Sequence, residues 1–106
     1  MSSRKTFTQS QRNEIWLYYI NSRMWDIFNN DRLNELQDSG SYIYAQAAPC
    51  PFCGEKMLKA QYQGVQPDKS FSWDIDHIDN NPTRNNVVNL QPMHPWCNKK
   101  KAGQNI

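Results

Sequence analysis

Apolar positions near the start of the chain recur with the period of an α-helix. Seven of them fall on one helical face: Ile15, Trp16, Tyr19, Ile20, Met24, Ile27 and Phe28. Thr8 and Gln11, three places apart, match the capping-box pattern that begins many helices. The spacing therefore predicts an amphipathic helix of roughly 20 residues that begins after Thr8 and covers a small core. Its aromatic residues are most simply explained as core packing, with a base-stacking platform as the alternative.

The other predicted elements are shorter and are separated by polar runs. In chain order they are a helix over 32–38, a strand over 56–62, a loop over 63–69, a strand over 71–78, a loop over 79–86 and a helix over 95–103. The strand over 71–78 is indicated by the alternation of Phe71, Trp73 and Ile75 with polar residues. Helices and strands together predict an α+β fold.

Length and composition limit the class of protein. The chain has 106 residues and 38% hydrophobic content, which suits one domain over 1–106 whose core is too small to be stable without a cross-link. The mean hydropathy is −0.91, and no apolar run reaches the roughly 18 residues that a membrane span requires. The N-terminus lacks the apolar core of a secretion signal, so we expect no membrane partner and a reducing, cytoplasmic location, where cysteines rarely pair.

The charges along the chain are unevenly distributed. A net charge of +2 is too small to indicate a nucleic-acid partner by itself. A run of lysines occupies 99–101, and the carboxylates of Asp74, Asp76 and Asp79 lie ahead of it. The lysine run alone fits a solvated helix face as well as it fits a nucleic-acid surface, so its meaning depends on the motifs beside it.

Two residue pairs with the same spacing offer metal ligands. Cys50 and Cys53 are separated by two residues and followed by Gly54, and His94 and Cys97 repeat that spacing downstream. Thiolate and imidazole donors in this arrangement are typical of a tetrahedral zinc site. The alternative is a redox-active dithiol, which is usually found in a thioredoxin-like βαβ pattern that is not visible here. We therefore predict a structural Zn²⁺ site that contributes to the folding free energy.

A second group of side chains offers oxygen and nitrogen donors. Asp74, Asp76 and His77 lie at the end of the predicted strand over 71–78. Such hard ligands favour Mg²⁺, Mn²⁺ or Ca²⁺ over zinc. In an arbitrary protein, solvated carboxylates beside an incidental histidine would be the simpler interpretation. The neighbouring motifs favour a metal site.

Four motifs follow one another between residues 50 and 103: Cys50-x-x-Cys53, Asp76-His77-Ile78, Asn89-Leu90-Gln91-Pro92 and Cys97-Asn98-Lys99-Lys100-Lys101. In this order they resemble the HNH endonuclease family, over about half of the chain. One position departs from the family pattern, because the second pair begins with His94 where family members usually have cysteine. Imidazole is an accepted zinc ligand, so we expect the zinc site to be retained and His94 to have no catalytic role.

The resemblance implies a fold. It is a small, zinc-stabilised ββα-metal domain of the HNH type, treble-clef-like, over 49–106, and it is preceded by N-terminal helices over 1–48. In this family the ββα-metal element is often embedded in a zinc scaffold of paired cysteines.

The resemblance also implies roles for individual residues. His77 would be the general base, Asp76 and Asn98 would bind the catalytic divalent ion, Mg²⁺ or Mn²⁺, and Asn89 would support the loop that follows the histidine. Asp74 would either bind the ion as a further carboxylate ligand or contact it through water, and the sequence does not decide between the two. A neutral imidazole, with an ordinary pKa near 6.5, is suited to take a proton from water around neutral pH.

The activity implied by the resemblance is hydrolysis of DNA phosphodiester bonds to leave 5′-phosphate and 3′-hydroxyl ends, with Arg84 and Lys101 in contact with phosphates. The alternative is a non-catalytic, zinc-stabilised nucleic-acid-binding or adaptor module. One site per chain means that cutting both strands requires a homodimer, two successive nicks or a partner protein, and the sequence leaves these open. The compact form suggests a phage-type or restriction-type nuclease, acting in the host cytosol if phage-encoded.

Overall fold

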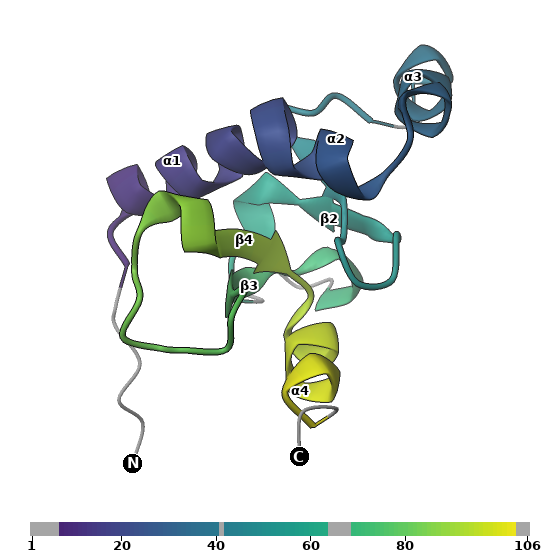
Figure 1. Cartoon of the computed structure of the whole chain (residues 1–106). Helices are drawn as coiled ribbons and strands as arrows, with labels where there is room; N and C mark the ends of the chain where they lie inside the picture. The colour runs from purple at the N-terminus through teal and green to yellow at the C-terminus, as the bar shows by residue number, and fades with distance from the viewer. Residues whose placement is uncertain (1–6, 41, 64–68, 104–106) are drawn as a thin grey trace.

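The computed structural model describes residues 7–40, 42–63 and 69–103. Its elements in chain order are α1 (Gln9–Tyr18), a π-helical segment (Tyr19–Arg23), α2 (Met24–Ile27), α3 (Asn30–Asp38), β1 (Ala47–Pro49), β2 (Lys56–Leu58), β3 (Asp74–His77), β4 (Leu90–Met93) and α4 (Pro95–Gly103). The strands lie between the long N-terminal helix and α4, while α3 stands apart from both (Figure 1). The described residues form a small α+β domain.

The long N-terminal helix begins where the sequence predicts. Thr8 Oγ1 accepts a hydrogen bond from Gln11 N at 3.1 Å, and Gln11 Oε1 accepts one from Thr8 N at 2.9 Å, which completes the capping box. The helix ends at Ile27, and the next residue, Phe28, has an extended backbone. Between α1 and α2 it widens into one π-helical segment, Tyr19–Arg23, which the four-residue apolar spacing did not predict.

The other two helices also agree with the sequence in type. Helix α3 begins at Asn30, two residues before the predicted start, because the side chain of Asn29 accepts a hydrogen bond from Arg32 N at 2.7 Å and caps the helix there. Helix α4 spans the predicted range, Pro95–Gly103, with proline at its first position.

The strands form two antiparallel hairpins. Strand β1 pairs with β2, and β3 pairs with β4 so that Asp76 lies opposite Gln91. Strands β1 and β4 were not predicted, because each is short and contains a proline, Pro49 and Pro92 respectively, which weakens the strand pattern.

Both predicted strands are shorter than expected. Strand β2 continues as a 3₁₀ turn, Lys59–Gln61, and β3 is preceded by another, Lys69–Phe71. Tyr62 and Trp73 still form an isolated bridge beyond the strand ends. Most of the loop predicted over 63–69 lies outside the described residues.

One apolar core joins the helices to the hairpins. The rings of Trp16 and Trp73 lie 5.1 Å apart between centroids, and each indole N–H is satisfied by a backbone carbonyl: Trp16 donates to Tyr44 O and Trp73 to Lys59 O. The core includes residues from Phe7 to Cys97. Among the described helices, none has the length and apolar character needed to span a bilayer.

Candidate metal centre and buried polar cluster

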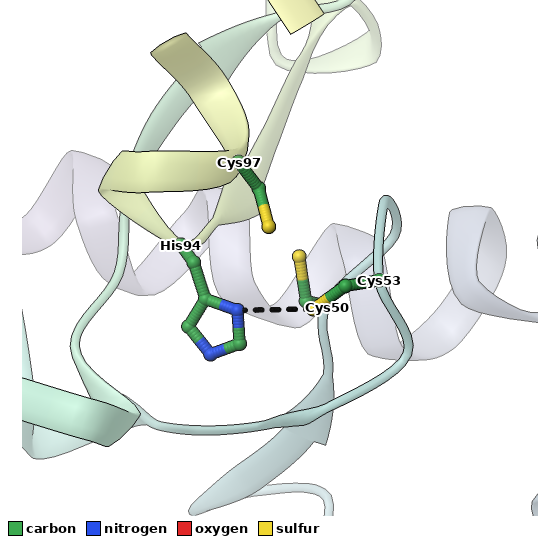
Figure 2. A group of neighbouring side chains, drawn as sticks. All are labelled: Cys50, Cys53, His94 and Cys97. Carbon is green, nitrogen blue, oxygen red and sulfur yellow. Dashed lines mark hydrogen bonds between the residues drawn. The ribbon is translucent and has the colours of Figure 1, made fainter. Parts of the chain in front are cut away.

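The four predicted zinc ligands come together in space. Cys50 and Cys53 lie in the turn between β1 and β2, while His94 and Cys97 lie at the start of α4. Their ligand atoms are all within 4.8 Å of one another, and the three sulfurs and the imidazole point toward a common centre (Figure 2). This Cys₃His donor set is consistent with a structural Zn²⁺ ion that joins the first hairpin to the last helix.

The turn that carries the cysteine pair has the backbone geometry that sulfur ligands need. Gly54 has φ +79°, a conformation that favours glycine, and its N–H donates to Cys50 O at 2.8 Å. Two further N–H groups face sulfur: Phe52 N lies 3.4 Å from Cys50 Sγ, and Glu55 N lies 3.5 Å from Cys53 Sγ.

His94 is oriented for metal binding through Nδ1. Its Nε2 lies 3.0 Å from the carbonyl oxygen of Lys56, so Nε2 carries the proton and donates it there. Nδ1 faces the cluster, 3.3 Å from Cys53 Sγ. The ring of Trp96 stacks on that of His94 with centroids 4.5 Å apart and planes within 11°.

The thiol of Cys97 shows why this cluster favours a cation. Burial raises the pKa of Cys97 well above its ordinary value, and the neighbouring Cys50 and Cys53 raise it further. Three thiolates this close repel one another, and a divalent ion among them offsets that repulsion.

A second cluster, of buried polar side chains, lies on the β3–β4 hairpin. Its members are Asp76, His77, Asn89 and Gln91. Asp76 is only 1% exposed, and its Oδ2 accepts a hydrogen bond from Gln91 Nε2 at 2.8 Å across the strand pair. Gln91 Oε1 in turn accepts one from Arg23 Nε at 3.3 Å. The π-helical segment thus contacts the residue that orients Asp76.

Lys101 closes this cluster from α4. Among the described residues, its ammonium contacts Asp76 Oδ1, His77 O and Ile78 O, each at 3.2 Å, and Asn80 Oδ1 at 2.7 Å. These contacts hold the last helix against the end of β3. The phosphate contact expected of Lys101 stays a prediction, and its ammonium is bound within the chain in this structure.

Asn98, on α4, contacts the backbone of β3 at Ile75, the residue before Asp76. Its Nδ2 donates to the carbonyl oxygen of Ile75 at 3.3 Å, which leaves its amide oxygen as a donor atom for a cation. Asn98 and Lys101 are three residues apart and therefore share one face of α4, the face toward β3.

Asp74 occupies a different environment from Asp76. Its Oδ1 accepts hydrogen bonds from Ile75 N at 2.8 Å and from Gln63 Nε2 at 3.4 Å. Within the part of the chain that the structure describes, the Cys₃His cluster is the one group of three or more thiol, imidazole or carboxylate ligands that lie close enough for one ion. A metal-binding role for Asp74 stays a prediction.

His77, at the end of β3, is 7% exposed. Its Nε2 lies 2.8 Å from Asn85 Oδ1, in the loop between the two strands. The ring of Phe7 lies 6.5 Å from the imidazole between centroids, on the side of the N-terminal helix.

Asn89 fixes the loop that connects His77 to β4. Its Nδ2 donates to Asp79 Oδ1 at 3.0 Å and to Arg84 O at 2.9 Å, and its Oδ1 accepts from Asp79 N at 3.2 Å. The backbone N–H of Asn81 and the amide of Asn89 lower the pKa of Asp79. Asp79 also forms an ion pair with Arg84 at 2.9 Å, so Arg84 too is bound within the chain, and its phosphate contact stays a prediction.

Two residues that contact the acidic and imidazole groups of this cluster, Gln91 and Asn85, were not predicted as site residues from the sequence. Gln91 could have been found from strand register, had β4 been predicted, because it lies opposite Asp76. Asn85 gives no such signal, since it is one of several asparagines in a polar loop.

Comparisons with family models, curated proteins and solved structures find no match to this chain.

Proposed function

We propose that the protein is a metal-dependent endonuclease that hydrolyses DNA phosphodiester bonds, with His77 as the general base. The observation that carries this proposal is the placement of Asp76 and His77 at the end of β3 beside Asn98 of α4, whose amide is bonded to the peptide preceding Asp76. The HNH-like motif order supports the same allocation of roles.

The donor atoms near Asp76 fit a hard divalent cation. A buried carboxylate and an amide oxygen are the ligand types that Mg²⁺ and Mn²⁺ prefer. The close approach of the Lys101 ammonium to Asp76 indicates that this carboxylate attracts positive charge. Asp76 and Asn98 would hold the ion, which when bound would stabilise negative charge on the phosphate and on the departing 3′ oxygen.

The remaining chemistry belongs to residues of the chain. His77 accepts a proton from water, and the resulting hydroxide attacks phosphorus as the P–O3′ bond breaks, leaving a 5′-phosphate and a 3′-hydroxyl end. Gln91 holds the carboxylate of Asp76, and Asn89 holds the loop after His77. The Cys₃His cluster keeps α4, which carries Asn98, close to the hairpins.

One observation favours the alternative of a non-catalytic nucleic-acid-binding module. Both carboxylate oxygens of Asp76 already have partners within the chain, Gln91 on Oδ2 and Lys101 on Oδ1. If Lys101 permanently replaces a divalent ion, the site cannot hydrolyse a phosphodiester. The two functions differ in whether the purified protein cuts DNA.

The test is nicking of supercoiled plasmid in Mg²⁺ or Mn²⁺, followed by sequencing of the ends. His77→Ala is expected to slow nicking by at least about 100-fold, because a general base typically contributes that much. Its zinc content and DNA retention should match the wild type. Asn86→Ala, an exposed position in the same loop, is the control and should retain activity. A wild-type protein that leaves all DNA and RNA intact with both ions would establish the binding-module alternative.

A further inference from the structure

The hydrogen bond between His77 and Asn85 determines which imidazole nitrogen is available for chemistry. Nε2 of His77 lies 2.8 Å from Asn85 Oδ1. An amide oxygen is only an acceptor, so the neutral ring must carry its proton on Nε2. The lone pair then resides on Nδ1. Among the described residues, none forms a hydrogen bond to Nδ1.

Asn85 is itself held at this distance by the loop. The peptide carbonyls on either side of it, Arg84 O and Asn86 O, accept hydrogen bonds from Nδ2 and N of Asn89, at 2.9 and 2.8 Å. Because the backbone is bonded to the buried Asn89 both before and after Asn85, the loop holds the position from which the Asn85 side chain reaches His77.

The orientation of the Asn85 amide decides whether His77 is able to act as a base. If Nδ2 of Asn85 faced Nε2, the imidazole would accept there and carry its proton on Nδ1, with no lone pair left for water. With Oδ1 facing Nε2, Nδ1 keeps its lone pair and the hydrogen bond stabilises the positive charge that develops when the ring takes a second proton.

We propose that Asn85 is a positioning residue that holds His77 as the Nε2–H tautomer, so that Nδ1 is the nitrogen that takes the proton from the attacking water. This rests on the proposed function of His77. In the step, a water O–H bond breaks and its proton moves to Nδ1, giving an imidazolium whose Nε2–H still donates to Asn85. The oxygen of that water forms the new P–O bond while the electron pair of the P–O3′ bond leaves with O3′, which takes up a proton from solvent water to become the 3′-hydroxyl.

The tautomer is measurable without any cleavage assay. The chain has two histidines, and ¹⁵N NMR at about pH 8 reports the protonation state of each ring nitrogen in the neutral form. In the zinc-loaded wild type we expect an unprotonated Nδ1 and a protonated Nε2 at His77. His94, with Nε2 bonded to Lys56 O, provides an internal reference.

Two variants test the role of the side chain. Asn85→Leu keeps a similar volume but removes the acceptor, and it should give a mixture of His77 tautomers and slow nicking by about 100-fold. Asn85→Asp keeps an acceptor oxygen and should retain the Nε2–H tautomer and activity within about tenfold of the wild type. Asn86→Leu, at the adjacent exposed position, should change neither readout.

The outcomes separate this inference from the proposed function. A wild-type His77 protonated on Nδ1, or an Asn85→Leu variant with an unchanged tautomer, would overturn the role of Asn85 even if the protein cuts DNA. Conversely, suppose that the protein has no nuclease activity, that its His77 is the Nε2–H tautomer, and that Asn85→Leu loses this tautomer. That result would show that Asn85 orients His77 and would overturn the proposed hydrolysis.

Discussion

The ammonium nitrogen of Lys101 lies 3.2 Å from Oδ1 of Asp76, so the last helix, α4, supplies the positive charge that faces a buried carboxylate of β3. The carboxylate is 1% exposed, and the lysine side chain is 18% exposed. Removing one member of such a buried pair leaves an uncompensated charge, which costs more than the pair itself contributes.

Lys101→Met is therefore expected to lower the free energy of unfolding by about 3 kcal/mol, because it leaves Asp76 buried with one oxygen unpaired. Urea denaturation of the zinc-loaded protein measures this change. Lys100→Met is the matched control, since Lys100 is the exposed neighbour in the same helix. Its unfolding free energy should change by no more than about 0.5 kcal/mol. Equal stabilities for the two variants would mean that the ammonium does not compensate Asp76 in solution.

Zinc removal should unfold much of the domain. The Cys₃His cluster joins the β1–β2 turn to the start of α4, and the chain is too small to hold these segments together with its apolar core alone. We expect one zinc per chain by elemental analysis, and loss of the native circular dichroism spectrum when a strong chelator removes it.

The zinc prediction has a matched pair of variants. Cys97→Ser, at a buried ligand, should abolish stoichiometric zinc, whereas Phe52→Ala, between the two turn cysteines, should keep it. A protein that stays folded without zinc and forms a reversible Cys50–Cys53 disulfide would instead support the redox-dithiol interpretation.

The sequence predicts the Cys₃His cluster but not the contacts of the buried polar cluster on the β3–β4 hairpin, and the difference has a physical reason. Cysteine pairs with fixed spacing and a following Gly54 restrict their own local geometry, so Cys50, Cys53, His94 and Cys97 were predicted as one site and the structure brings them together. Likewise, the four-residue spacing of Trp16, Ile20 and Met24 determined a buried helical face. Both features depend mainly on nearby residues.

The contacts of the polar cluster depend instead on tertiary register. Gln91 faces Asp76 only because β4 pairs with β3 in one particular alignment, and Lys101 reaches Asp76 only because α4 packs on that hairpin. Asn85 faces His77 only through the path of a loop. None of these contacts has a local sequence pattern, and the π-helical segment next to Gln91 has none either.

Asn89 provides the most direct test of whether the loop after His77 is fixed by side-chain hydrogen bonds. Asn89→Asp is nearly isosteric, but it removes the N–H donors to Asp79 Oδ1 and Arg84 O and places a second carboxylate 3.0 Å from the first. We expect the free energy of unfolding to fall by about 1 kcal/mol from the lost hydrogen bond to Arg84 O, and like-charge repulsion between the new carboxylate and Asp79 adds to that loss.

The control for Asn89→Asp is Asn86→Asp, which introduces the same charge at an exposed position of the same loop. Amide hydrogen exchange should show faster exchange at Ile78 N, which donates to Asn89 O at 2.8 Å, in the Asn89 variant alone. Both variants should retain zinc, because the Cys₃His ligands lie in other segments. Identical exchange and stability in the two variants would show that the loop is held by its backbone and its ion pair, and that the amide of Asn89 does not stabilise it.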